Sequence, residues 1–290
     1  MIQAIQAKVL LAHIKQPDPW FGLKYNMNLY RGCEHQCIYC DSRSQCYRIE
    51  TFTDVLVKTN AITLLRQELP RKRVKGTIGT GSMSDPYTPA ERHYNLTGQA
   101  LEVIAEFDFP VHIITKSDLV LKDLDALRDI NRNLAIVSFT ITTTDDAQAK
   151  RIEPGAPLVS ARLKAMKKLA ENGIHTGVTM MPILPFIQDN EENITNIVKQ
   201  AKDAGASYIL PWFGMSLRDQ QRAYYYQKLD KLFPGLRRQY ERTYGNRYGC
   251  PANNAQQLRN LFYDLCQQLN IATTVPQYAP EAPPEQLSLF

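Results

Sequence analysis

The chain lacks the features that define several protein classes. None of its apolar runs reaches the roughly 18 residues that a membrane-spanning helix requires, so we expect no membrane partner. Residues 1–19 carry charges and no apolar stretch backed by a cleavage site, which argues against a signal peptide and for a cytoplasmic location. No low-complexity tract or short repeat precedes the last dozen residues, so a repeat architecture is not predicted.

Cysteines are few and unevenly placed. Six cysteines in a cytoplasmic chain of 290 residues argue against a disulfide framework and favour metal binding or catalysis. Half of them fall within eight residues, at Cys33, Cys37 and Cys40. Cys250 and Cys266 are scattered and are interpreted as buried thiols. For Cys46, a packed thiol and a spare ligand both remain open.

The net charge of +5 is mild, but its distribution is uneven. Basic residues cluster at 71–75, and residues 237–248 interleave arginines with tyrosines. Arginine contacts to phosphate combined with aromatic stacking hold single-stranded nucleic acid. One hypothesis is therefore DNA binding through Arg237, Arg238, Arg242 and Arg247. The alternative is a solvated helix surface with tyrosines at its edge.

Short β-branched apolar runs alternate with helical stretches from residue 25 onward. Strands are predicted at 25–29, 77–79, 111–115, 135–141, 175–181 and 208–210, with helices at 98–107, 121–130, 159–172 and 191–204. Six such units indicate a parallel α/β architecture. No Gly-x-Gly-x-x-Gly follows the first strand, so a partial (β/α)6 TIM-type barrel fits better than a Rossmann sheet. Its chemistry is expected at the C-terminal ends of the strands.

Composition divides the chain into four parts. We predict an N-terminal extension over 1–24, the partial barrel over 25–215, a helical C-terminal region over 216–272 and a flexible tail over 273–290. The tail begins with a proline-rich stretch, which is typical of linkers.

Cys33, Cys37 and Cys40 form a Cys-x3-Cys-x2-Cys loop just after the first predicted strand. Close thiolates favour soft metals, and iron–sulfur clusters are held by cysteine. Three ligands to a four-iron cluster leave one iron open to a small molecule. A zinc site completed by His35 is the alternative. The cluster is favoured because no second Cys-x2-Cys exists and because an aromatic residue, Tyr39, precedes the last cysteine.

The pattern Cys-x3-Cys-x-aromatic-Cys after a first barrel strand resembles the radical SAM superfamily. The resemblance implies a [4Fe-4S] cluster on the three cysteines, whose open iron binds S-adenosylmethionine. The reduced cluster then cleaves this cofactor to methionine and a 5′-deoxyadenosyl radical. The resemblance makes Tyr39 and the three cysteines catalytic residues, and it implies a reductase partner such as flavodoxin or ferredoxin.

A narrower resemblance, over residues 25–271, is to the spore photoproduct lyase group, the SplB-type "DNA repair photolyases". The segments that show this resemblance are Gly-Ser-Met-Ser-Asp-Pro-Tyr at 81–87, Thr-Lys-Ser at 115–117, Phe-Thr-Ile-Thr at 139–142 and Arg-Ile-Glu-Pro at 151–154. It implies cofactor-binding roles for Tyr39, Ser82, Ser84, Asp85, Lys116, Ser138 and Thr140. Lys116 is expected to contact the cofactor carboxylate. Taken singly, each residue also fits a turn, strand or surface role, but their order at successive strand ends favours a site.

Two positions depart from the lyase pattern. Ser82 stands where the lyase has its hydrogen-donating cysteine, and an alkyl O–H bond is too strong to replace a thiol in that step. Asp41 stands where the lyase has a tyrosine after its last cluster cysteine. The resemblance therefore predicts radical generation and action on nucleic acid, in DNA repair or modification, without predicting spore-photoproduct repair itself.

The C-terminal residues Gln286-Leu287-Ser288-Leu289-Phe290 resemble the bacterial sliding-clamp-binding peptide. In such peptides a glutamine and a Leu-Phe pair dock into adjacent pockets, which here implies Gln286, Leu287, Leu289 and Phe290. A proline-rich leader followed by apolar anchors suits a segment that orders on a partner. The alternative is an apolar tail that packs on its own domain.

Three functions remain open at the level of sequence. The first is a radical SAM enzyme acting on DNA and recruited by the clamp. The second is a radical SAM enzyme acting on RNA, a protein or a small molecule. The third is a non-enzymatic zinc or iron–sulfur protein that binds nucleic acid. Iron content and 5′-deoxyadenosine production separate the third from the others.

Overall fold

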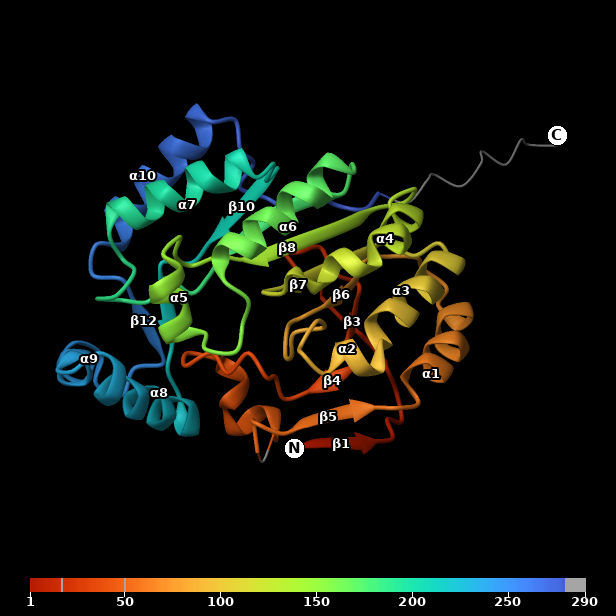
Figure 1. Ribbon diagram of the computed structural model, residues 1–290, viewed down its shortest axis with the longest axis horizontal. Helices are drawn as coiled ribbons and strands as arrows, with labels where there is room; N and C mark the ends of the chain where they lie inside the picture. Colours follow the sequence, from red (N-terminus) through yellow and green to blue (C-terminus); the bar gives the residue numbers. More distant parts are fainter. Residues whose placement is uncertain (17, 50, 280–290) are drawn as a thin grey trace.

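A seven-stranded sheet forms the centre of the computed structural model, which describes residues 1–16, 18–49 and 51–279 (Figure 1). Its strand order is β10-β9-β8-β7-β6-β3-β2. The parallel strands are β3 (Tyr25–Met27), β6 (Ile78–Thr80), β7 (Val111–Thr115), β8 (Ala135–Thr140), β9 (His175–Met180) and β10 (Tyr208–Pro211). Because β10 and β2 end the strand order, the sheet is an open barrel. This confirms the predicted α/β partial barrel.

Helices cover the outer face of this sheet (Figure 1). They are α1 (Ala61–Glu68), α3 (Leu96–Glu106), α4 (Leu124–Ile130), α6 (Val159–Glu171) and α7 (Glu191–Asp203). The short helices α2 (Glu91–Tyr94) and α5 (Asp146–Ile152) lie in the segments that follow β6 and β8. In α7 the buried residues Ile194, Ile197, Val198 and Ala201 recur at helical spacing and form the stripe that packs on the core. Asn190 caps this helix by accepting a hydrogen bond from the Asn193 amide at 2.9 Å.

Short turns of 3-10 helix supplement these elements. They are η1 (Asp41–Arg43), η2 (Gln45–Tyr47), η3 (Leu69–Arg71) and η4 (Asp118–Asp123). The helix expected at 121–130 therefore begins as η4 and becomes α-helical at Leu124.

The N-terminal residues contribute two strands to the sheets. Strand β2 (Leu11–His13) pairs antiparallel with β3 at the edge of the main sheet. Strand β1 (Ile2–Ile5) pairs with β5 (Val55–Lys58), which also pairs with β4 (Tyr30–Arg31). The cysteine loop follows β4, so the small sheet supports its entry side.

The C-terminal region is helical but interrupted. It contains α8 (Asp219–Leu232), α9 (Leu236–Tyr244) and α10 (Ala255–Gln268). Between α9 and α10, β12 (Gly249–Pro251) pairs antiparallel with β11 (Gly214–Ser216), where glycine and proline disfavour helix.

The start of the predicted flexible tail is ordered against the barrel. Ala272 bridges to Tyr208 in β10, and Val275 is buried beside Leu210. The clamp-like residues Gln286–Phe290 lie outside the described residues.

Across the helices of the described part of the chain, none combines the length and apolar character needed to cross a membrane.

Candidate active site

A cavity of about 410 Å³ lies at the C-terminal ends of the parallel strands. Its wall includes Thr80 from β6, Thr115 from β7, Thr140 from β8 and Thr179 from β9. The opposite wall is the loop that carries the cysteines. The chemistry of (β/α) barrels gathers at this end, so the position agrees with the sequence-based expectation.

The three clustered cysteines all line this cavity. Cys33 and Cys37 are buried and Cys40 is half-buried, and all six cysteines of the chain are free thiols. Gln36, between the first two, has a φ of 53° and donates a hydrogen bond from its side-chain amide to the Cys33 carbonyl at 2.7 Å. The turn at Gln36 therefore closes the loop on itself and directs its cysteines to the cavity.

Residues 151–155 clamp the cysteine loop onto the barrel. The Ile38 amide donates to the Ile152 carbonyl at 2.9 Å, and the Gly155 amide donates to the His35 carbonyl at 2.9 Å. A Cβ on Gly155 would lie only 2.0 Å from the Glu34 carbonyl oxygen, so only glycine permits this approach. The motif Arg-Ile-Glu-Pro therefore serves the loop directly.

A buried ion pair lies beneath Tyr39. Arg162 from α6 and Glu153 are each 1% exposed, and Arg162 Nη2 lies 2.6 Å from Glu153 Oε2. The Tyr39 hydroxyl donates to the other oxygen of Glu153, and Arg162 Nη1 donates to the Thr140 carbonyl at 3.0 Å. Burial alone would raise the pKa of Glu153, but Arg162 and Lys116 outweigh it and lower that pKa. The carboxylate therefore stays charged and joins the cysteine loop to β8.

Lys116 places a cation opposite the cysteine loop. Its side chain lines the cavity, with Nζ 5.8 Å from the centre of the Tyr39 ring. Burial works against its charge, but Cys37, Glu153 and Asp85 raise the pKa of Lys116 above its ordinary value. The cavity therefore holds a lysine ammonium beside three potential metal ligands.

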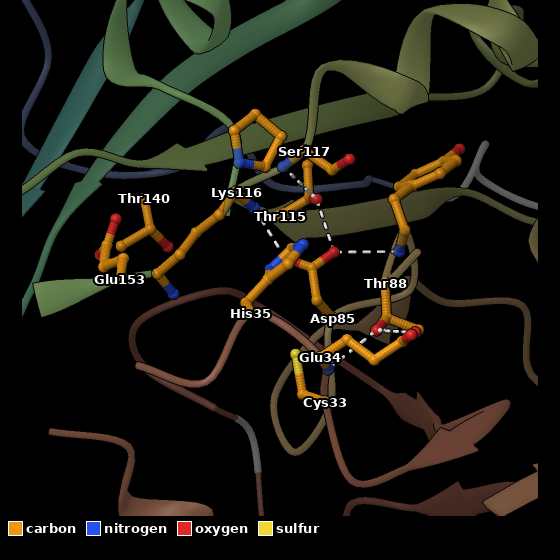
Figure 2. A network of polar contacts seen from close by, with 12 residues as sticks. Cys33, Glu34, His35, Asp85, Thr88, Thr115, Lys116, Ser117, Thr140 and Glu153 are labelled. Carbon is orange, nitrogen blue, oxygen red and sulfur yellow. Dashed lines mark hydrogen bonds and ion pairs between the residues drawn. The ribbon is translucent and has the colours of Figure 1, made fainter. Parts of the chain in front are cut away.

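Asp85 organises the site rather than offering a free carboxylate. It accepts hydrogen bonds from the Tyr87 amide at 2.9 Å, the Thr115 hydroxyl at 2.6 Å and the Lys116 amide at 2.7 Å (Figure 2). Its Oδ2 also lies 3.2 Å from His35 Nδ1. Burial opposes the charge, yet His35 and these donors lower the pKa of Asp85. Asp85 therefore fixes the end of β7, from which Lys116 projects.

His35 faces this carboxylate through its Nδ1 atom. Burial lowers the pKa of His35, but Cys33 and Asp85 outweigh it and raise that pKa to about 10. Among the described residues, no three histidine, cysteine or carboxylate side chains converge on one ion. In a four-iron cluster each cysteine binds a different iron, so the spread thiols of this loop fit a cluster better than zinc.

The remaining predicted cofactor residues fall into two groups. Thr140 and Ser82 line the cavity; Thr140 pairs with Thr179 at 3.0 Å, and Ser82 donates to Asn26 at 3.2 Å. Ser84 is buried outside the cavity wall.

Ser138, also predicted to bind the cofactor, is not part of the cavity wall. Its hydroxyl is fully buried, 2.7 Å from His112 Nε2 and hydrogen-bonded to Tyr208. Because side chains two residues apart share a strand face, Ser138 has the same orientation as Thr140 but lies deeper in the barrel. It belongs to a polar layer below the cavity floor.

The Arg/Tyr stretch of residues 237–248 divides between the core and the surface. Tyr240 and Tyr244 are buried in the core between α8 and the cysteine loop, so they present no stacking surface. Arg237 pairs with Asp230 at 3.0 Å and Glu241 at 2.9 Å. The exposed cations of this region include Arg238, Arg242 and Arg247.

Several wall residues escaped the sequence analysis. Trp212, 41% exposed, and Met181 line the cavity from the β10 and β9 sides. Glu153 and Arg162 were missed as a pair, although an arginine at a stripe position of α6 was a signal that it has a buried partner.

Comparisons with known proteins agree with this geometry. Residues 27–201 match the family described as the Radical SAM superfamily. An "Uncharacterized protein" of Mycobacterium tuberculosis is 28% identical over 279 residues, which cover 92% of this chain and 82% of that protein. A point mutant of spore photoproduct lyase matches with a TM-score of 0.71 at 17% identity, covering 96% of this chain and 82% of the lyase.

Cofactor-bound structures are among these matches. A spore photoproduct lyase mutant with bound AdoMet and dinucleoside spore photoproduct has a TM-score of 0.69 at 17% identity, with 96% of this chain and 82% of the lyase covered. A radical S-adenosylmethionine methyltransferase from Kitasatospora setae, with tryptophan and a SAM analog, has a TM-score of 0.55 at 12% identity, with 84% of this chain and 51% of that enzyme covered.

The family match covers the cysteine loop and most of the barrel. The cysteine donor set and the lysine across the cavity fit the cofactors of this family, a [4Fe-4S] cluster and S-adenosylmethionine. The chain belongs to the radical SAM superfamily of enzymes.

Proposed function

We propose that this radical SAM enzyme acts on DNA, in repair or modification of a base. The observation that carries the proposal is the likeness to spore photoproduct lyase over 96% of this chain, in a structure that holds a dinucleoside spore photoproduct. The cavity supports it, because Trp212 in its lining offers an exposed aromatic ring on which a base could stack. The basic surface at Arg238 and Arg242 supplies charge for a DNA backbone.

Each cofactor contact follows from the position of a side chain. Cys33, Cys37 and Cys40 would hold the cluster, and the Lys116 ammonium would bind the carboxylate of S-adenosylmethionine with help from Thr140. When bound, the reduced cluster and S-adenosylmethionine supply a radical that abstracts hydrogen from a substrate. Tyr39, fixed through its hydroxyl to Glu153, would shield the cluster side of the cavity.

Photoproduct lysis is not the reaction that we assign. The thiol position of the lyase is occupied by Ser82, whose hydroxyl donates to Asn26 at 3.2 Å. Asp41 accepts from Tyr47 at 3.0 Å and Ser216 at 3.1 Å and pairs with Arg218, so it braces the cavity wall. Neither residue donates a hydrogen atom readily.

Deuterium transfer tests the proposal. Anaerobic, iron-reconstituted protein would be incubated with dithionite, S-adenosylmethionine and a deuterated DNA oligonucleotide, and 5′-deoxyadenosine would be examined by mass spectrometry. Deuterium in this product from DNA, and none from RNA of the same sequence, supports the proposal. 5′-Deoxyadenosine that forms without deuterium from any DNA overturns the DNA assignment and leaves the enzyme class intact.

The tail proposal is separate. We propose that Gln286, Leu287, Leu289 and Phe290 bind a bacterial sliding clamp. A second proposed partner is a flavodoxin or ferredoxin, which would reduce the cluster. The free thiols agree with a reducing cytoplasm, which is the location that we propose. Surface plasmon resonance on immobilised clamp should show binding that is lost when residues 286–290 are deleted; binding unchanged by the deletion would refute it.

A further inference from the structure

A second hollow, of about 320 Å³, lies beside the small N-terminal sheet. Its wall includes Gln6, Asn28, Arg31, Lys58 and Met83. It has no role in the site described above. Its polar groups are dominated by two cations, Arg31 at the end of β4 and Lys58 at the end of β5.

Among the described residues, the hydrogen-bond partners of these two cations are carbonyl oxygens. Arg31 Nη2 donates to the carbonyls of Tyr47 and Arg48, both at 3.0 Å, and Lys58 Nζ donates to the Asn28 carbonyl at 2.6 Å. Within the described ranges, neither cation has a carboxylate at ion-pair distance. Burial and Arg31 lower the pKa of Lys58, although Glu68 acts in the opposite direction. Two half-buried cations side by side repel each other, and an anion between them relieves that repulsion.

The Arg31 guanidinium keeps hydrogen-bond donors that an anion such as phosphate can accept. Arg31 uses Nη2 for both carbonyls, so the hydrogen bonds of the described residues leave its Nε and Nη1 unused. Beside the Lys58 ammonium, these separate donors can form charge-assisted hydrogen bonds, and this pair of cations suits phosphate oxygens. A carboxylate would match the same pair, but the position of the hollow favours phosphate.

The hollow adjoins the main cavity. Arg31 holds the carbonyl of Tyr47, whose side chain lines the main cavity. Met83 lines the hollow, whereas its neighbour Ser82 lines the cavity, and Ser42 of the cavity wall donates to the Met83 carbonyl at 2.8 Å. The two depressions are therefore separated by a single layer of chain. A nucleotide turned into a pocket brings its own flanking phosphates to the rim.

We infer that Arg31 and Lys58 bind a backbone phosphate of the DNA strand whose nucleotide enters the main cavity. This inference rests on the proposed DNA function and adds the anchor that sets which nucleotide reaches the cavity. The contact is non-covalent and takes no part in bond breaking.

Salt-dependent binding of a fluorescent single-stranded DNA oligonucleotide tests it. Lys58→Gln should weaken binding and reduce the slope of log K against log salt concentration by about 0.7, the value for one phosphate contact on a single strand. Lys58→Arg should keep the slope. Lys167→Gln, at an exposed position on α6, is the matched control and should leave the slope unchanged. An unchanged slope for Lys58→Gln would overturn the inference while leaving the DNA function standing.

A methylphosphonate scan locates the phosphate. One phosphate at a time is replaced with a neutral methylphosphonate. DNA binding by the wild type should weaken most at a single position, and at that position the replacement should not weaken binding by Lys58→Gln any further. Losses that are equal in the two proteins at every position overturn the inference. Inorganic phosphate, added at constant ionic strength, should not displace the DNA strand from the wild type. Displacement by inorganic phosphate that occurs in the wild type and is lost in Lys58→Gln would show that the hollow binds a free anion instead. A wild type that binds no DNA refutes both the inference and the proposed function.

Discussion

The buried pair Arg162–Glu153 permits the sharpest prediction. Glu153→Gln preserves the side-chain shape and removes the charge that compensates Arg162. Breaking a buried ion pair by removing one partner costs about 3–5 kcal/mol, because the remaining charge is left without water or a counter-ion. Both partners are 1% exposed, so solvent does not screen the loss. We expect the free energy of unfolding of the variant to fall by that amount.

Arg66–Glu106 is a matched control on the same chain. Its N–O distance is 2.6 Å, the same as that of the buried pair, but its partners are 50% and 53% exposed. Glu106→Gln should therefore cost less than about 1 kcal/mol. Urea unfolding of the reduced apo protein measures both variants. A cost for Glu153→Gln as small as that for Glu106→Gln would show that burial does not strengthen this pair.

The same carboxylate predicts a pH dependence. Burial raises the pKa of Glu153, but Arg162 and Lys116 hold it below the ordinary 4.5. A lowered folded-state pKa contributes stability that is complete above the unfolded-state pKa and is lost as the pH falls through the folded-state pKa. The difference in unfolding free energy between wild type and Glu153→Gln should be constant from neutral pH to about 5 and shrink below about 4.5. A difference that grows on acidification would contradict the assigned sign.

Three further predictions concern the cysteine loop and Lys116. Cys37→Ala should lose the iron while keeping the circular dichroism spectrum of the wild type, and Cys266→Ala, in α10, should keep both; iron bound normally by Cys37→Ala would refute the ligand assignment. Gly155→Ala should lower the free energy of unfolding by about 1–3 kcal/mol through overpacking and should reduce iron uptake. Gly249→Ala should leave thermal unfolding unchanged, because a Cβ added at Gly249 would have no atom within 4 Å. Lys116→Met should weaken S-adenosylmethionine binding by about 1.5–3 kcal/mol in equilibrium dialysis, the worth of a hydrogen bond to a charged group; unchanged affinity would remove Lys116 from the cofactor site.

The parallel strands could be predicted from the sequence because burial on both faces leaves a local signal. Residues 135–140 are buried at every position, and they read as one continuous β-branched and apolar run. The N-terminal strands leave no such signal. The β1 residues Ile2, Gln3 and Ala4 are exposed, and β4 has only two residues. Both strands pair with β5, and for β1 the partner Val55 lies about fifty residues away in sequence from Ile2.

The tyrosines of α9 show that helical periodicity predicts which side chains are buried better than amino-acid composition does. The interleaved arginines and tyrosines over 237–248 allow either a nucleic-acid-binding face or a solvated helix surface with tyrosines at its edge. Tyr240 and Tyr244 stand four residues apart, which places them on one side of a helix, and that side packs on the core. Arg242, between them, falls on the opposite, solvated side. Helical spacing therefore separates the two residue types that composition alone had combined.

The Glu153–Arg162 pair could not be predicted as a contact, because nothing local requires it. Glu153 follows the end of α5, and Arg162 belongs to α6. Their meeting depends on how those helices pack, whereas the cysteine spacing is a local property of one loop. Sequence therefore indicates the ligands of the cluster more readily than the groups that position them.

The cysteine loop is held by contacts that do not involve its sulfur atoms. Main-chain bonds at Ile38 and Gly155 fix its middle, the Tyr39 hydroxyl fixes its end, and the Glu34 amide donates to Thr88 at 3.1 Å near its start. A loop held in this way keeps its shape when iron is absent, since none of these bonds needs the metal. This differs from small zinc domains, which unfold without their ion. The loss of iron from Cys37→Ala should therefore leave the barrel folded, whereas Gly155→Ala should disturb the loop even though every metal ligand is present.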